Sequence, residues 1–172
     1  GLPPFDRIRP EHFAPAFAEG RKRELAEVAS IAANPETPDF ANTIEAFERR
    51  GELSERVGSI FRNLNDSHTS PALQAVARQD APLRARHEST IFQNAALFSR
   101  VEAVYQKRAG LGLSPEALRL VEQTHKRFVR AGARLDAAKK ARLAEVAQIL
   151  ASRTNQFGQN LLADTGAFEL VL

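Results

Sequence analysis

Proline, glycine and helix-capping residues divide this chain into segments in which apolar residues recur every three or four positions. Ser70-Pro71 and Ser114-Pro115 are start signals, because a serine side chain caps a helix and proline suits its first turn. Alanine is abundant and β-branched residues are scattered, which favours helix over strand. We therefore expect an all-α fold: a single domain of about six helices over residues 1–172, with long antiparallel neighbours and short loops.

The apolar stripes place these helices along the chain. The first is expected over about 10–33, where Phe13 and Phe17 share one face, and the last over about 135–163. The four helices between them are expected to begin near residues 42, 71, 94 and 115.

Three positions within this pattern predict local departures. Asn42, followed three residues later by Glu45, predicts a capping box at the start of the second helix. Gly51 then lies inside that helix and weakens it by about 1 kcal/mol relative to alanine. Pro82 is expected to kink or split the third helix. The tail from Phe168 is expected to be a strand or an extended exit.

Charge and composition argue against two classes of partner. Lysine and arginine number 24 and the acidic residues 21, a net charge of +3, and both signs alternate in segments such as 19–24. A nucleic-acid binder more often gathers its basic residues on one face. The eleven Phe, one Tyr and no Trp are typical of core packing rather than of base stacking. No apolar run approaches the roughly 18–20 residues that span a bilayer. We therefore expect neither a nucleic-acid nor a membrane partner.

The ends of the chain suggest a longer natural protein. Gly1 opens the chain and methionine is absent throughout, so we expect a processed or cloned piece. The apolar ending at 168–172 suggests that the natural chain continues. An interface cut in this way would leave an apolar patch on the surface.

The histidines do not form a recognisable metal motif. His87-Glu88 begins the His-Glu-x-x-His pattern of zinc proteases, but the second ligand position holds Ile91. The other histidines are far apart in the sequence: His12, His68 and His125. We expect His125 to be a partly buried helix residue and the other histidines to be surface or capping groups.

Other catalytic patterns are equally weak. The Gly-x-Ser-x-Gly elbow does not occur, and Gly110-Leu111-Gly112 lacks the later Gly and Lys of a phosphate loop, so we interpret it as a helix stop. The carboxylate pairs Glu45/Glu48 and Glu52/Glu55 lie among arginines, as on a solvated, salt-linked helix face. We therefore assign no catalytic, cofactor-binding or metal-binding residue to this chain.

The order of several segments is more informative than any one of them. In the first half these segments are 4–17 (PFDRIRPEHFAPAF), 34–44 (NPETPDFANTI), 51–57 (GELSERV), 67–69 and 73–74. In the second half they are 111–114 (LGLS), 119–122 (RLVE), 127–135 (RFVRAGARL) and 154–162 (TNQFGQNLL). In this order they resemble the thimet oligopeptidase family (M3) of zinc metallopeptidases, and the second half is most similar to bacterial peptidyl-dipeptidases. The resemblance covers essentially the whole chain. Arg21 and Arg153 depart from it, since relatives are expected to be more apolar there.

The resemblance implies an enzyme several times longer than this chain, almost wholly helical and closed like a clamshell around a deep channel. Its zinc would lie on a His-Glu-x-x-His helix in the later part, with a further Glu as ligand. Such enzymes cleave short, unfolded peptides in the cytoplasm, and the peptidyl-dipeptidase type releases dipeptides from the C-terminus.

On this basis residues 1–172 correspond to the N-terminal helical, non-catalytic domain, which forms a wall of the channel and limits access to small unfolded peptides. This chain would hold no zinc and would be inactive alone. Its partners would be the missing C-terminal catalytic domain of the same polypeptide and peptide substrates. The alternative is a stand-alone helical protein-interaction module without enzymatic activity.

Overall fold

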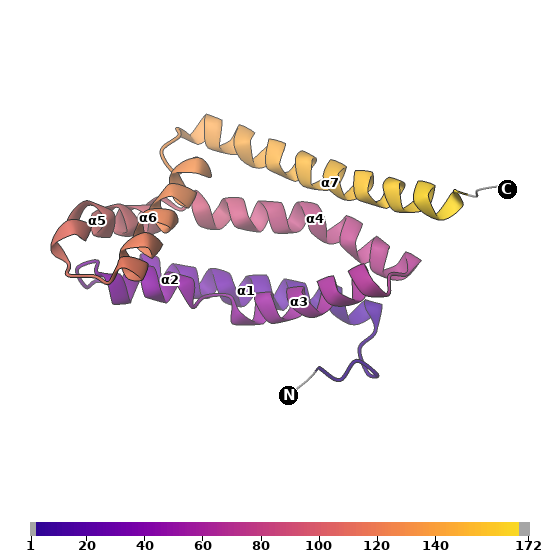
Figure 1. Cartoon of the computed structure of the whole chain (residues 1–172). Coiled ribbons are helices and arrows are strands. Elements are labelled where there is room, and N and C mark those ends of the chain that lie inside the picture. Colours follow the sequence, from indigo (N-terminus) through magenta and orange to yellow (C-terminus); the bar gives the residue numbers. More distant parts are fainter. Residues whose placement is uncertain (1–2, 169–172) are drawn as a thin grey trace.

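The computed structural model describes residues 3–168, and this part of the chain contains helices and no strand (Figure 1). Six long helices form the framework: α1 Phe13–Ala32, α3 Glu52–Ser67, α4 Pro71–Phe92, α5 Ala95–Lys107, α6 Pro115–Arg130 and α7 Ala137–Ala167. Short helical turns complete the set: η1 Pro10–His12, η2 Phe40–Glu45, α2 Ala46–Glu48 and η3 Arg108–Gly110. The expected all-α fold of about six helices is confirmed.

Most of the predicted helix starts are confirmed by their caps. At three of them a side-chain oxygen accepts a hydrogen bond from the backbone N–H three residues later: Ser70, Asn94 and Ser114. These bonds satisfy one of the N–H groups that the first turn of a helix leaves without a partner.

The predicted cap of the second helix is wrong. Asp39, not Asn42, is the capping residue: its Oδ1 accepts a hydrogen bond from the Asn42 N–H at 2.7 Å, and Asn42 Oδ1 accepts one from the Asp39 N–H at 3.0 Å. The helical turn therefore begins at Phe40, and Glu45 plays no part in the box. Asn42 supplies the reciprocal bond that a Glu or Gln usually makes.

The prediction that Gly51 lies inside a helix is also wrong. Gly51 has φ 72°, in the left-handed region, so the helical path stops after Glu48 and restarts at Glu52. A Cβ at this position would lie 2.8 Å from the carboxyl carbon of Glu24. Glycine alone adopts this backbone without strain and leaves room for that side chain.

Pro82 does not split α4, which continues from Pro71 to Phe92, although Figure 1 shows this helix changing direction along its length. Phe168 itself is extended, with φ −72° and ψ 121°. The rest of the predicted strand or extended tail, 169–172, lies outside the described residues.

Aromatic side chains form the centres of two apolar clusters. In the larger, the Phe128 ring lies 5.2 Å from Phe47 and 5.0 Å from Phe92, measured between centroids. In the smaller, Phe13 and Phe17 pack edge-on against Phe61. These contacts confirm the interpretation of phenylalanine as core packing, because edge-to-face pairs at this spacing are favourable beyond the area they bury.

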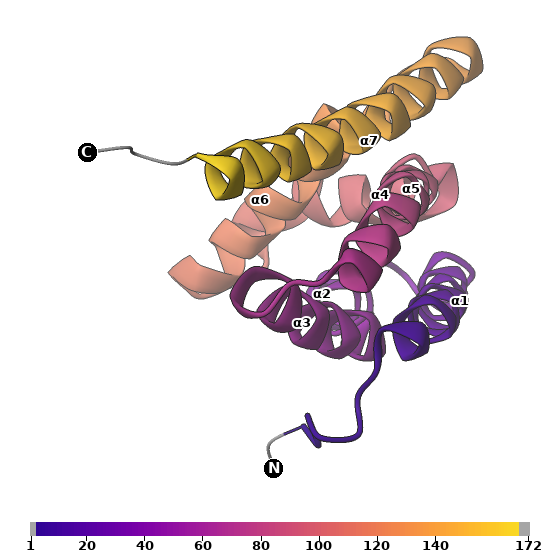
Figure 2. The ribbon, with the colours of Figure 1, turned by 90° about the vertical axis from the view of Figure 1, so that its right-hand side faces the viewer.

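α3 runs antiparallel to α1 and α7 runs antiparallel to α4, whereas α1 and α4 run in the same direction (Figure 1). α7 lies at the edge of the molecule. Helices α1, α3 and α4 pack side by side, α5 and α6 lie at one end, and α7 runs back along α4 (Figure 1). Figure 2 shows α4 lying between α7 and the α1–α3 pair. α7 has no buried residue along its 31 positions. Within residues 3–168, none of the helices combines the length and the apolar character needed to cross a membrane.

Candidate functional site

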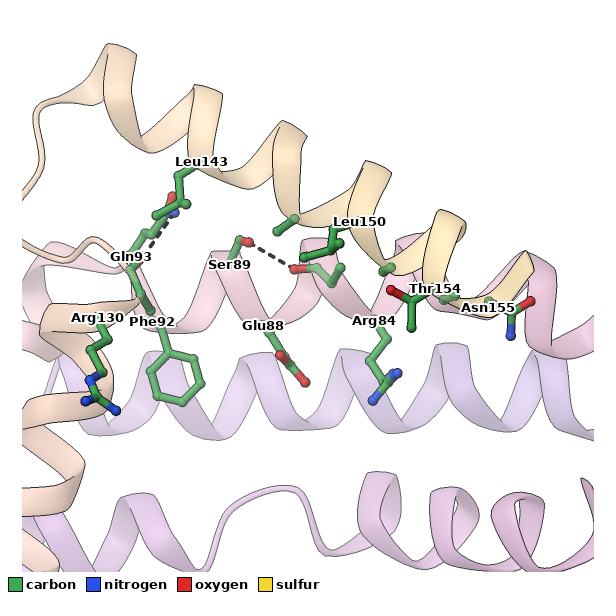
Figure 3. Close-up of a pocket in the computed structure, with 15 residues that line it drawn as sticks. Arg84, Glu88, Ser89, Phe92, Gln93, Arg130, Leu143, Leu150, Thr154 and Asn155 are labelled. Atoms are coloured by element: carbon green, nitrogen blue, oxygen red, sulfur yellow. Dashed lines mark hydrogen bonds between the residues drawn. The ribbon is translucent and has the colours of Figure 1, made fainter. Parts of the chain in front are cut away.

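A groove of about 550 Å³ separates α7 from α4 and the end of α6 (Figure 3). Leu143 and Leu150 point from α7 towards α4, while Arg84 and Glu88 extend from α4 away from α7. Between the larger side chains the groove is lined by small ones, which let the two helices approach and leave space between them. These small residues are Ala81, Ala85, Ala147 and Ala151. The walls of the groove are mainly apolar.

His87 contributes to a buried ionic cluster rather than to a metal site. Its Nε2 donates to Glu24 Oε2 at 2.9 Å, and Arg50 Nε lies 3.3 Å from Glu24 Oε1. The side chains are only 9–12% exposed. The expectation that His87 is a surface or capping group is therefore wrong: α1 and α4 pack so closely here that its ring is enclosed. Ile91, at the failed ligand position, is a core residue.

The surroundings of Glu24 keep it ionised. The hydrogen bond from His87 lowers the pKa of the Glu24 carboxyl and outweighs burial, which acts in the opposite direction, and the Arg50 charge lowers it further. Glu27 completes the junction, since its Oε2 accepts a hydrogen bond from the Gly51 N–H at 2.7 Å. None of these groups lines the groove, so the cluster holds α1, α4 and the Gly51 turn together and offers no acid or base to a ligand there.

His125 takes part in a second histidine–carboxylate pair. Its Nε2 donates to Glu102 Oε2 at 3.0 Å, and Arg134 also donates to that carboxylate. Partial burial acts to raise the pKa of Glu102, but hydrogen bonds from Gln106, His125 and Arg134 lower it to about 2. The His125 ring stacks on Tyr105, with centroids 3.8 Å apart. His125 is a helix residue as predicted, and it is buried rather than partly buried, with 7% of its surface exposed.

The pair lacks the remaining parts of a nucleophilic site. A hollow beside His125 has four long cationic side chains in its lining and contains no serine, threonine or cysteine among its described residues. A histidine–carboxylate pair activates a nucleophile only when one lies within hydrogen-bond reach. The arrangement therefore anchors α5, α6 and the α6–α7 turn to one another.

Zinc does not fit the described residues. Between residues 3 and 168 there is no group of three or more His, Cys, Asp or Glu side chains placed to hold a metal ion. Zinc sites need three or four such ligands around one point. His12 lies apart from the two ionic clusters, and its Nδ1 accepts a hydrogen bond from the Arg9 N–H, as expected for a capping group.

The carboxylate pairs noted in the sequence are surface ion pairs. Arg49 bonds to Glu45 and Arg56 to Glu52, both at 2.5 Å and four residues apart on exposed helix faces. Solvated pairs of this kind do not desolvate a carboxylate enough to make it an acid catalyst. Gly110 closes a helical turn after α5, which confirms the interpretation of the Gly-Leu-Gly segment as a helix stop.

Sequence reasoning missed two buried charges, Arg50 and Arg100. Arg100 donates to the carbonyl oxygens of Asn34 at 2.6 Å and Glu36 at 3.0 Å, and also to Asn42. It therefore anchors the loop between α1 and η2. No local signal reveals such residues, because an arginine in an amphipathic helix looks the same whether it meets water or a carbonyl 64 residues away.

Comparison with known proteins finds relatives that are similar along nearly the whole chain. No family model matches it. It is 46% identical over 170 residues, 99% of its length, to the dipeptidyl carboxypeptidase of Escherichia coli, and 43% identical over 165 residues to that of Salmonella typhimurium. It is 25% identical over 164 residues to oligopeptidase A of Salmonella typhimurium. The chain spans about a quarter of the length of these relatives: 25%, 24% and 24%.

The matches cover nearly all of this chain and fall within the N-terminal part of the longer proteins. Identity is also distinctly higher to the dipeptidyl carboxypeptidases than to oligopeptidase A. Along nearly its whole length the chain is therefore similar to the N-terminal part of peptidases of the thimet oligopeptidase (M3) family, and more similar to dipeptidyl carboxypeptidase than to oligopeptidase A.

Proposed function

We propose that residues 1–172 form the N-terminal, non-catalytic domain of a peptidyl-dipeptidase that releases dipeptides from the C-termini of short peptides. The observation that carries this proposal is the 46% identity to a dipeptidyl carboxypeptidase along 99% of the chain, against 25% to oligopeptidase A. The activity, its zinc and its cytoplasmic location belong to the longer protein of which this chain would be one quarter.

The described residues support a non-catalytic role. The histidine–carboxylate pairs, Glu24–His87 and Glu102–His125, hold helices together, and the described residues offer no three-ligand metal group. We therefore propose that the zinc is held outside residues 1–172, on a His-Glu-x-x-His helix. The C-terminal catalytic domain is then the principal partner of this chain.

The shape of the domain supports a role as a wall of the substrate channel. α4 has 22 residues and α7 has 31, which at 1.5 Å per residue correspond to rods of about 33 and 46 Å. Rods of this length equal or exceed the diameter of a small folded domain. Side by side, they form a barrier that would admit an extended peptide and exclude a folded protein.

The test compares two proteins: the product of the complete source reading frame and the isolated 172-residue chain. We expect the longer protein to bind stoichiometric zinc and to release dipeptides from a peptide with a free C-terminus. It should fail on the same peptide with an amidated C-terminus, whereas an oligopeptidase would still cut internally. We expect the isolated chain to hydrolyse neither peptide.

His87→Ala serves as the internal control for the metal argument. Because His87 is enclosed in an ionic cluster, the substitution should lower stability and leave zinc content unchanged in folded protein. Hydrolysis by the 172-residue chain that is lost in this variant would refute the proposal. A reading frame that stops near residue 172 would favour the alternative of a stand-alone interaction module.

A further inference from the structure

Four exposed apolar residues form a stripe along α7. The members of this α7 stripe are Val146, Leu150, Phe157 and Leu161. Spacings of four, seven and four residues return to one side of a helix. These residues are 41%, 63%, 70% and 57% exposed, although large apolar residues of these types are most often buried in folded proteins.

The stripe is continuous with the groove between α4 and α7. Leu150 belongs to both, since it lines the groove together with Leu143 and Thr154 (Figure 3). α7 packs chiefly on α4 and leaves its other sides open, at the edge of the molecule (Figure 2). The groove and the stripe therefore form one elongated apolar surface, long enough to receive a helix. Apolar surfaces of this extent usually mark an interaction site.

The charges beside this surface are mainly positive. Arg84 and Arg130 line the groove, and Arg153 lies on α7 next to the stripe. None of the three arginines has a carboxylate within 4 Å among residues 3–168. Glu88 is the one carboxylate among the described lining residues. A complementary occupant would combine an apolar face with acidic flanks.

We propose that a helix of the same polypeptide, lying outside residues 1–172, packs its apolar face on the α7 stripe and places acidic side chains beside Arg84 and Arg153. The inference rests on the proposed function, because both place this chain within a longer protein. The length of the relatives favours this occupant over a second copy, because they contain about three times as much chain again beyond the matched part. A helix of this polypeptide also needs no encounter with a separate molecule, so its docking loses less entropy than the binding of a peptide.

The absence of cysteine from this sequence allows a direct test by thiol labelling. Leu150→Cys and Leu161→Cys place a thiol in the stripe. Ser152→Cys and Ala163→Cys are the matched controls, at exposed positions two residues after Leu150 and Leu161. Two residues correspond to a rotation of about 200°, so each control lies on the opposite side of the helix from the stripe. Each variant is labelled both in the 172-residue chain and in the complete protein, and the modified peptide is identified by mass.

In the isolated chain we expect all four thiols to react at similar rates. In the complete protein, the thiols at 150 and 161 should react at least about 100-fold more slowly, because a covered thiol reacts only after local opening. The controls should change little. Equal reactivity at all four positions in the complete protein would overturn the inference.

Other patterns of protection would identify a different occupant. Protection in the isolated chain that grows with protein concentration would show a second copy on the stripe. Protection in the complete protein that requires added peptide would show that the stripe binds substrate. Either result would overturn the inference.

The acidic flank is tested separately by charge reversal in the complete protein carrying Leu150→Cys. Arg84→Glu should raise the labelling rate, whereas Arg86→Glu should not, because Arg86 lies two residues further on α4 and does not line the groove. Equal effects would refute the predicted acidic flank. Peptide hydrolysis by the complete protein is measured on the same samples. Protection of the thiols without hydrolysis would refute only the proposed function. Hydrolysis without protection of the thiols would refute only this inference.

Discussion

Replacing Glu24 with alanine tests whether the buried ionic cluster holds the first helices together. The substitution leaves Arg50 and His87 without their shared carboxylate, and both of these side chains are about one-tenth exposed. Removing one partner of a fully buried pair costs roughly 3–5 kcal/mol. Because these side chains retain some contact with water, we expect the lower end, about 3 kcal/mol. For a chain of 172 residues this corresponds to a fall in Tm of about 10 °C.

The assay is urea and thermal unfolding of the 172-residue chain, followed by circular dichroism. Glu52→Ala is the matched control, since it also removes one carboxylate from an arginine pair, but on an exposed face. We expect the control to change the free energy of unfolding by less than about 1 kcal/mol. Equal losses in the two variants, or no loss for Glu24→Ala, would refute the role of the cluster.

The pH dependence of the same variant gives an independent check with a defined sign. The pKa of Glu24 is lower in the folded chain than the ordinary 4.5. Its contribution is therefore fully present above about pH 4.5 and is lost as the pH falls through the folded-state value. We expect wild-type stability to fall more steeply than that of Glu24→Ala below pH 4.5. Parallel curves would contradict this account.

Three further predictions follow from single contacts. Gly51→Ala should lower the free energy of unfolding in urea by about 1–2 kcal/mol, because φ is 72° and a Cβ would meet Glu24. If Gly51 lay inside a regular helix, the same substitution would instead raise the free energy of unfolding by about 1 kcal/mol. The Glu102 carboxyl should titrate near pH 2 when followed by NMR. Its contribution to stability is then lost only as the pH falls from about 4.5 towards 2. A titration midpoint near 4.5 would contradict the hydrogen bonds assigned to this carboxylate. Arg100→Ala should speed amide exchange in residues 34–42 at least about tenfold, because three hydrogen bonds to that segment are lost, while exchange in α7 should not change.

Helix boundaries could be predicted wherever the signal is local. Ser70, Asn94 and Ser114 cap their helices because the accepting oxygen and the donating N–H are only three residues apart. The error at Asn42 arose within the same range, since Asp39 and Asn42 are both good caps and only the observed backbone shows which one starts the turn. The error at Gly51 has a different cause: its conformation leaves room for Glu24, 27 residues earlier.

The candidate surface could be predicted only in part. The apolar residues of α7 are visible in the sequence as a helical stripe, but a stripe of this kind usually marks the face that enters the core. Here α7 contacts α4 instead through smaller side chains such as Ala147 and Ala151, and Leu150 and Phe157 remain largely exposed. Periodicity alone does not distinguish these faces, because both lie on the same amphipathic helix.

The sequence by itself determined the helical class, most of the caps, the aromatic core and the similarity to peptidases, because each depends on residue type, short spacing or the order of segments. Only the tertiary structure decided which charges are enclosed and which apolar face is left open. His87 meets Glu24 across 63 residues, and Arg100 meets the Glu36 carbonyl across 64. Such pairs exist because helix packing brings distant side chains together, and the free energy of each pair depends on the water that this packing excludes.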